Sequence, residues 1–326
     1  MRLAVLVAGI TLALSLHNVS ASDKVTLRLG DVKGDRFASL KASGELDNLP
    51  YDLKLTAFDS GAPVQEALNA GALDVGFTGD LPFLFVYAAG APVKAVGAWK
   101  NNPDSIALLT RPDARVHSLQ DLKGKQIAVN RGGWGHYLIL GLLERAGLKP
   151  SDVTLRFLGP VDGRAALTSG AVAAWAPWEP YIATSTQIDG TVRVPQGGGH
   201  GIMSGYSYAL ARNEALADAQ KRKAIADLLT RLAKAQVWAA QHPQAFAKAL
   251  GQTLNMPVTI TSSWIEDARI RPLVFDAAVI PTLQKSADFF YRYRVLPKNV
   301  DVSSAFDFTL ADGANQVAKQ YKGDNR

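Results

Sequence analysis

The chain has 326 residues, of which 48% are hydrophobic and 20% charged, a globular composition long enough for two lobes with their own cores. The formal charge of +6 comes from 35 basic and 29 acidic residues that are mixed along the chain, and no basic run with interleaved aromatic residues indicates nucleic-acid binding. The absence of cysteine excludes disulfides, thiolate metal sites, cysteine nucleophiles and lipid attachment through an N-terminal cysteine.

Residues 1–21 are predicted to form a cleaved export signal. A short positive start at Arg2 is followed by an apolar stretch from Leu3 to Leu16, and small residues at 19–21 suit signal peptidase. The alternative is a membrane anchor, but a span needs about 20 apolar residues. Export without a lipid anchor predicts a soluble protein of the periplasm.

The next segments alternate between strand and helix patterns. Strands are predicted at 25–30, 53–58 and 73–78, with helices at 37–42 and from Pro63 to a stop at Gly71. A further strand at 126–130 leads into a glycine-rich loop and a helix over 136–146. Alternation of this kind predicts α/β lobes, each with a mostly parallel sheet flanked by helices.

The chain becomes rich in Ala, Leu, Lys and Gln from Asn213 onward, which predicts helices packed on the first lobe. We predict that lobe 1 comprises 22–108 plus 210–326 and that lobe 2 comprises 109–209. Segments 66–75 and 165–174 resemble each other. This similarity indicates either two related lobes or only the features that any two α/β units share.

The strongest local pattern is a strand, a glycine loop and a helix start at 130–136. Glycines at 132, 133 and 135 allow close backbone approach, and the start of the helix predicted from His136 offers free N–H groups, so we expect an anion to bind there. Arg131 could add a charged contact; the alternative is a tight turn with a surface arginine. The spacing matches neither a P-loop nor a dinucleotide fingerprint.

Ser60 and Gly61 precede Pro63 and form a second candidate anion site, or an ordinary N-cap. Trp134 and Trp178 are expected to form an apolar wall of a cleft, whereas Trp175 is expected in the core. The segment 196–206, with Ser204 and Tyr206, is either another wall with hydroxyl donors or a flexible surface loop.

Asp80 and Glu179 lie in the loops that follow the two similar segments, 66–75 and 165–174. We expect each to cap a helix or link the lobes, in preference to acid–base catalysis. The histidines are dispersed, no metal-ligand spacing occurs and no Gly-x-Ser-x-Gly nucleophile motif is present, so the sequence predicts no enzyme and no cofactor.

Three stretches, 58–90, 122–148 and 165–183, together resemble the solute-binding proteins for aliphatic sulfonates, taurine and nitrate, and most closely the aliphatic sulfonate branch. The resemblance implies the two-lobed type II fold of periplasmic binding proteins, with a ligand cleft between lobes that close on a hinge. It also implies delivery of the ligand to an ABC permease in the inner membrane. We expect the protein to be a monomer.

The family's pocket loops match a defined set of positions in this chain. They are Lys33, Ser60, Gly61, Thr78, Gly79, Asp80, Gly132, Gly133, Trp134, Trp178, Glu179, Ser204 and Tyr206. The chain departs from the pattern in having Arg-Gly-Gly-Trp at 131–134 and glutamate at 179, and the added indole favours a larger or aryl-bearing anion.

The sequence therefore predicts a binder of a small organic anion, foremost an aliphatic or aryl sulfonate. Nitrate, taurine, a sulfate ester or a pyrimidine vitamin precursor are alternative ligands. An enzyme on the same scaffold is the rival, but the related desulfinases use a cysteine and this chain has none.

Overall fold

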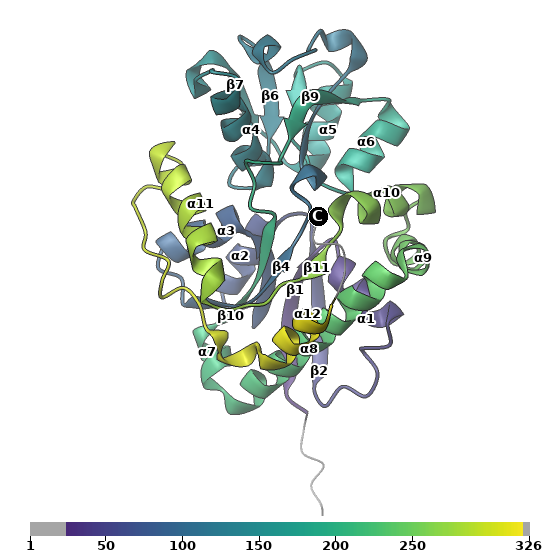
Figure 1. The fold of residues 1–326 in the computed structure, drawn as a ribbon, viewed down its shortest axis with the longest axis vertical. Helices are drawn as coiled ribbons and strands as arrows, with labels where there is room; N and C mark the ends of the chain where they lie inside the picture. The colour runs from purple at the N-terminus through teal and green to yellow at the C-terminus, as the bar shows by residue number, and fades with distance from the viewer. Residues whose placement is uncertain (1–23, 322–326) are drawn as a thin grey trace, which may run out of the picture.

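The computed structural model describes residues 24–321, so the predicted signal segment lies outside the described residues. The described chain forms two β-sheets, each covered by helices (Figure 1). The first sheet contains β1 (Thr26–Val32), β2 (Asp52–Phe58), β3 (Val75–Gly79), β4 (Val93–Lys100), β10 (Tyr206–Arg212) and β11 (Arg271–Pro272). The second contains β5 (Ala107–Thr110), β6 (Gln126–Val129), β7 (Thr154–Phe157), β8 (Ala174–Trp175) and β9 (Val192–Gly198).

Strand order confirms the predicted α/β class with mostly parallel sheets. In the first sheet the order is β11-β4-β10-β3-β1-β2; β2, β1 and β3 are parallel, and β10 is antiparallel to β3 and β4. In the second the order is β7-β6-β8-β5-β9, with β5 antiparallel to its neighbours. The carboxyl ends of the parallel strands carry the loops that border the site.

Twelve α-helices are described between residues 24 and 321. In the first part of the chain they are α1 (Asp35–Ala42), α2 (Gly61–Asn69), α3 (Asp80–Ala88), α4 (Trp134–Arg145), α5 (Pro160–Thr168) and α6 (Tyr181–Asp189). The C-terminal part adds α7 (Asn213–Ala217), α8 (Ala219–Gln241), α9 (Pro243–Leu254), α10 (Val258–Ala268), α11 (Ile280–Arg292) and α12 (Asp312–Gln320).

Alternating side chains of the first sheet build a core on each face. Leu27, Leu29 and Phe77 pack with α8, while the opposite face is covered by α2, α3 and α11. In the second sheet, Trp175 packs in a core with α5 and α6, which confirms that it is a core residue.

The chain passes between the two sheets at 101–106 and 199–205. The predicted lobe boundaries, after 108 and after 209, fall inside β5 and β10, and the division of the chain into lobes stays a prediction. Two such strand connections between sheets are the kind of joint around which lobes can hinge.

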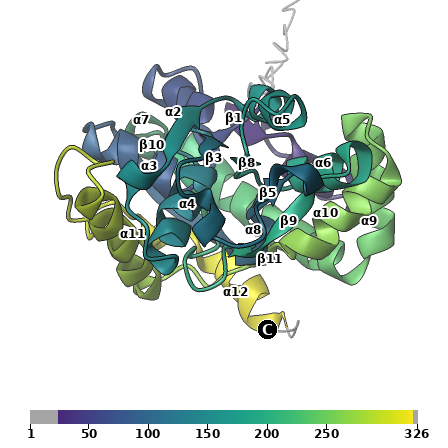
Figure 2. The same ribbon diagram turned by 90° about the horizontal axis from the view of Figure 1, so that it is seen from above.

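The helical C-terminal part reaches further than predicted. Besides covering the first sheet, it contacts the second lobe at two places: α10 packs against α6, and α11 packs against Tyr137 of α4. Seen from above, α11 and the α9–α10 pair flank the molecule on opposite sides (Figure 2). The C-terminal helices thus pack on the first sheet, as expected, and α10 and α11 in addition carry polar and aromatic side chains that contact the second lobe.

Candidate functional site

A cavity of about 100 Å³ lies between the two sheets and is lined from both lobes. Nine of the predicted site residues line it: Lys33, Ser60, Gly61, Thr78, Gly79, Gly133, Trp134, Trp178 and Glu179. Further lining residues include Arg36, Asn101, Ser105, Asn130, Ser207 and Trp264, none of which the sequence analysis singled out. The structure therefore brings the two glycine-containing helix starts into one cavity.

The helix starts at α2 and α4 lack side-chain caps. Ser60 is the N-cap of α2 and Gly133 is the N-cap of α4, both with extended backbone, and neither accepts a capping hydrogen bond through its side chain. The first N–H groups of a helix have no partner within the helix, and the helix dipole makes this end attractive to negative charge. Two such starts from different lobes make the cavity a site for an anion.

Three other helix starts at this side of the sheets are satisfied by the chain's own carboxylates. At α1, Asp31 and Asp35 accept from the Arg36 N–H at 3.1 and 2.9 Å. At α3, Asp80 accepts from the Leu81 N–H at 3.0 Å. These starts are closed to an added anion.

Glu179 satisfies the start of α6, where its Oε2 accepts from the Ala183 N–H at 3.1 Å. Asp80 and Glu179 thus each accept a hydrogen bond from an N–H group in the first turn of a helix, although the N-cap residues themselves are Gly79 and Pro180.

Thr78 adds a hydroxyl that has no partner inside the protein. Thr78 is 4% exposed, lines the cavity, and its Oγ1 has no hydrogen-bond partner. A buried hydroxyl without a partner is costly, so this group is positioned for a ligand that hydrogen-bonds to it. Gly61 lies against it, since a Cβ built on Gly61 would collide with Thr78 Oγ1.

Arg36 places a buried positive charge on the cavity wall. Its Nη1 donates to Asp31 at 2.9 Å and to Asp35 at 3.1 Å, and its guanidinium lies 4.7 Å from the centroid of the Phe77 ring. Its Nη2 donates to Ser207 Oγ at 3.4 Å, and its Nε has no partner.

Arg36 falls in the turn before the predicted helix, where local sequence patterns do not indicate a buried residue. The two aspartates one and five residues before it are the feature of the sequence that could have indicated a buried ion pair. Burial first, and repulsion from Asp35 second, raise the pKa of Asp31 to about 7.

Indole rings form the apolar part of the lining. Trp134 of the second lobe lies so close to Gly79 of the first that a Cβ on Gly79 would collide with the indole. Trp178 packs edge-on against Tyr181 with ring centroids 5.5 Å apart. Trp264, from α10, supplies a third indole that only the tertiary fold brings to the site.

Lys33 connects the lobes on one side of the cavity. Its Nζ lies 2.5 Å from Asp59 Oδ1 and 5.1 Å from the centroid of the Tyr181 ring. Asp59 takes up part of its charge, so Lys33 adds a weaker field at the cavity than a free ammonium would.

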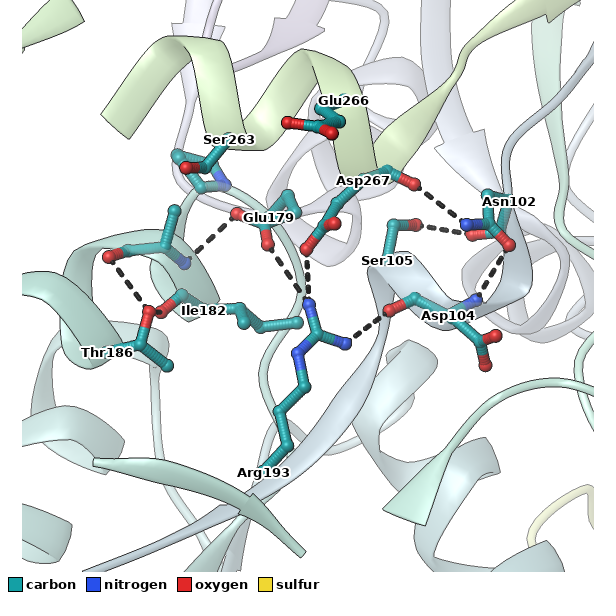
Figure 3. Close-up of polar contacts among 12 residues, drawn as sticks. Asn102, Asp104, Ser105, Glu179, Ile182, Thr186, Arg193, Ser263, Glu266 and Asp267 are labelled. Atoms are coloured by element: carbon teal, nitrogen blue, oxygen red, sulfur yellow. Dashed lines mark hydrogen bonds and ion pairs between the residues drawn. The ribbon is translucent and has the colours of Figure 1, made fainter. Parts of the chain in front are cut away.

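A polar cluster holds α10 against the second lobe (Figure 3). Arg193 of β9 forms an ion pair with Asp267 of α10, donates to the Asp104 carbonyl at 2.7 Å and lies 3.6 Å from Glu179 Oε1. Gln187 of α6 donates to Ser263 Oγ of α10 at 2.8 Å. These contacts join the two lobes beside the cavity.

Glu179 is the member of this cluster that also lines the cavity. Its side chain is 2% exposed, and its Oε1 has no hydrogen-bond partner. Burial is the main cause that raises the pKa of Glu179 to about 8, and the neighbouring Asp267 carboxyl acts in the same direction. Glu179 therefore keeps its proton to a higher pH than an exposed glutamate does, although Arg193 acts in the opposite direction, and it repels an anion less.

Five predicted site residues lie outside the cavity lining. Asp80 Oδ2 accepts from Ser204 Oγ at 3.1 Å and from Ser286 Oγ at 3.0 Å. Arg131 stacks on the Phe157 ring, 3.7 Å from its centroid. Gly132 and Tyr206 flank the lining without belonging to it.

The described residues offer no metal centre and no membrane span. Between residues 24 and 321, no group of three or more His, Asp or Glu side chains is placed to hold a metal ion. None of the helices in that range combines the length and the apolar character that a bilayer span requires.

Comparison with known proteins identifies a consistent set of relatives. The family model described as NMT1/THI5 like matches residues 52–246. A protein of Escherichia coli K12 named as an aliphatic sulfonates-binding protein is 33% identical over 299 residues, which cover 89% of this chain and 92% of the relative.

Two solved structures are similar over nearly the whole chain. The alkanesulfonate-binding protein of Xanthomonas axonopodis pv. citri bound to MOPS matches with a TM-score of 0.79 and 29% identity, covering 89% of this chain and 100% of that one. The periplasmic aliphatic sulphonate binding protein of Escherichia coli matches with a TM-score of 0.77 and 28% identity, covering 92% and 95%.

Proposed function

The chain belongs to the NMT1/THI5-like family, and from this membership we propose that it is the periplasmic solute-binding component of an ABC importer for an organic sulfonate. The observation that carries the proposal is the pair of uncapped helix starts, α2 and α4, that face one cavity from two lobes. A sulfonate has three acceptor oxygens and one negative charge, which match free N–H groups and helix dipoles.

The buried Thr78 hydroxyl and the Arg36 guanidinium add donors around the same head group. The raised pKa of Glu179 reduces repulsion between its carboxyl and the anion, and Asp35, the other acid of the lining, is paired with Arg36. The indoles of Trp134 and Trp178 cover the part of the organic group that is next to the sulfonate. Binding is reversible, because the site needs only hydrogen bonds and apolar contact.

Lobe closure accompanies binding in this proposal. The ligand contacts α2 from one lobe and α4 from the other, so it binds more tightly to the closed arrangement and shifts the population toward it. The predicted signal at 1–21 directs the protein to the periplasm, where it acts as a monomer and delivers its ligand to a membrane permease. The relatives are named as binding proteins, in agreement with the expectation that this chain is not an enzyme.

A thermal-shift panel on the purified mature protein tests the ligand class. Methanesulfonate, longer alkanesulfonates, aryl sulfonates, taurine, sulfate esters, nitrate and pyrimidine precursors are compared. We expect alkane- or arylsulfonates to raise Tm with concentration, since a ligand at 100 times its Kd adds about 2.7 kcal/mol to the free energy of unfolding. A shift with nitrate or a pyrimidine precursor but with no sulfonate would contradict the proposal.

Replacing the indoles tests the placement of the ligand. Trp134→Ala and Trp178→Ala are each expected to weaken binding of an aryl sulfonate by about 10- to 100-fold, because each removes a large apolar contact. Tyr291→Ala, at an exposed aromatic residue outside the lining, is the matched control and should bind as the wild type does. Unchanged affinity in both tryptophan variants would show that the ligand lies elsewhere.

A further inference from the structure

A second and larger cavity lies beside the cleft cavity. Its volume is about 470 Å³, and we call it the side chamber. It is enclosed by α1, α8, α9 and α10, which lie together on one side of the molecule (Figure 1). Most of its wall is apolar, with Phe246, Leu250 and Trp264 among the buried contributors.

The side chamber and the cleft cavity share part of their walls. Five residues line both: Asp35, Arg36, Trp264, Ala268 and Ile270. The two spaces are therefore separated by no more than the thickness of these side chains. A ligand whose head group binds in the cleft lies one side chain away from the chamber.

Two polar groups of the chamber wall have no partner in the protein. Gln236 of α8 is 4% exposed and its Oε1 makes no hydrogen bond; Arg36 is 8% exposed and its Nε makes none. Buried polar atoms are almost always hydrogen-bonded, because leaving one unpaired costs free energy. A ligand that fills the chamber and carries a hydroxyl or amine would offer a partner to the Gln236 acceptor.

The two cavities differ in volume and therefore in the size of the group that each can hold. Ligand pockets for small organic molecules are typically about 300–1,000 Å³. The cleft cavity, at about 100 Å³, has room for a sulfonate head and little more, whereas the side chamber lies within that range.

We propose that the side chamber holds the organic body of the same ligand, which is then a long or bulky sulfonate whose apolar chain carries a hydroxyl or amine. This inference rests on the proposed function, because the head group is taken to bind at α2 and α4. The chain passes Arg36 and Trp264, packs on the apolar wall, and donates a hydrogen bond to Gln236 Oε1.

A chain-length series tests the chamber separately from the head-group site. Kd is measured by calorimetry for methanesulfonate, butanesulfonate, hexanesulfonate and octanesulfonate. We expect affinity to rise by roughly fourfold for each methylene that enters the chamber. If methanesulfonate binds and longer chains bind no better, the chamber proposal is wrong while the proposed function stands; if no sulfonate binds, the proposed function itself fails.

Filling the chamber should remove the gain from chain length. Ala239→Phe places a ring in the chamber, and Ala240→Trp places one at its exposed rim, where packing is not disturbed. Both variants are expected to bind methanesulfonate as the wild type does, which also shows that they are folded, and to lose most of the octanesulfonate gain. Ala245→Phe, exposed on α9 and outside the chamber wall, is the control. Wild-type affinity for octanesulfonate in both chamber variants would overturn the proposal.

Gln236→Leu tests the hydrogen bond. The variant should bind ω-hydroxyoctanesulfonate about 3- to 10-fold more weakly than the wild type and octanesulfonate at least as tightly, because only the hydroxyl chain donates to Gln236. Equal losses for both ligands would argue against a hydrogen bond to the chain.

Discussion

The helix starts near the cleft fall into two groups, according to whether a carboxyl group of the chain accepts hydrogen bonds from their first N–H groups. α1, α3 and α6 carry carboxyl groups of their own on their first N–H groups, whereas α2 and α4 begin at Ser60 and Gly133 without any side-chain cap. Both groups come from the same strand–loop–helix units. What differs is whether the acceptor for the N–H groups belongs to the chain or has to be supplied from outside.

From this contrast we expect capped helix starts to contribute to stability and uncapped helix starts to contribute to ligand binding. A capped start contributes to the folded state at all times, because its partner is covalently part of the chain. An uncapped start leaves its N–H groups to water until an anion binds, and its contribution then appears as affinity. The following four predictions test that division, beginning with the largest effect.

Ser60→Asp should convert an uncapped start into a capped one. Aspartate is at least as good an N-cap as serine, so the free energy of unfolding should stay the same or rise by up to about 1 kcal/mol. A carboxylate about 4 Å from the bound anion costs on the order of 4 kcal/mol at an effective dielectric constant of about 20, so sulfonate affinity should fall by about 100-fold or more. Calorimetry with Ser60→Asn, which is neutral and of the same size, provides the control.

Asp80→Ala is the reverse experiment on a capped start. It removes the acceptor of the Leu81 N–H and the Oδ2 acceptor that Ser204 and Ser286 share, which leaves these hydroxyls only their longer or accepting contacts. Denaturant unfolding should show a loss of about 1–3 kcal/mol. Sulfonate Kd should change by less than about twofold, since Asp80 does not line the cavity. A large loss of affinity at unchanged stability would contradict the assignment of capped starts to stability and uncapped starts to binding.

Glu179 accepts a hydrogen bond at the start of α6 and also lines the cavity. Its deprotonation should therefore change both stability and ligand affinity. Its pKa is raised from 4.5 to about 8 in the folded protein, so the stabilisation from its neutral form is complete below about pH 4.5 and is lost as pH rises through about 8. Deprotonation also places a negative charge beside the ligand. Sulfonate affinity should therefore fall by about three- to tenfold between pH 7 and pH 9.

Glu179→Gln removes that titration while keeping an amide acceptor for the Ala183 N–H. Its affinity should be independent of pH over the same interval. A wild-type affinity that stays constant from pH 7 to pH 9 would show that Glu179 remains in one protonation state.

Arg131→Ala should have the smallest effect. The guanidinium stacks on Phe157 and lies outside the cavity lining, although it precedes the uncapped start of α4. Sulfonate Kd should change by less than about twofold, because a cation outside the cavity is screened by solvent. A loss of tenfold or more would mean that Arg131 turns toward the ligand on closure.

Local patterns in the sequence predicted the fold class and the glycine-containing helix starts. Strand alternation, Pro63 at a first helical turn and Gly71 at a helix end each depend on neighbours along the chain. The structure has α2 ending at Asn69 and β6 starting at Gln126, close to the predicted limits. The possible N-cap at Ser60 follows from the same local patterns, whereas α4 begins at Trp134, two residues before the predicted start at His136.

The missed residues depend on tertiary contacts. Trp264 comes from α10, which packs on α9 and also contacts the second lobe through Asp267 and Ser263. Arg36 looked like one surface cation among many, and its burial against Phe77 follows from the packing of the first sheet. No local periodicity distinguishes such residues from ordinary core or surface positions.

The contribution of α10 to both cavities has a consequence for biogenesis. Residues 24–212 contain every strand of the two sheets except β11, but α8 and α11, which cover the two faces of the first sheet, come later in the chain. Trp264, Ala268 and Ile270 belong to the same last third. A chain that ended before α10 would therefore lack part of the wall of both cavities, so the two cavities are completed only after most of the polypeptide has been made.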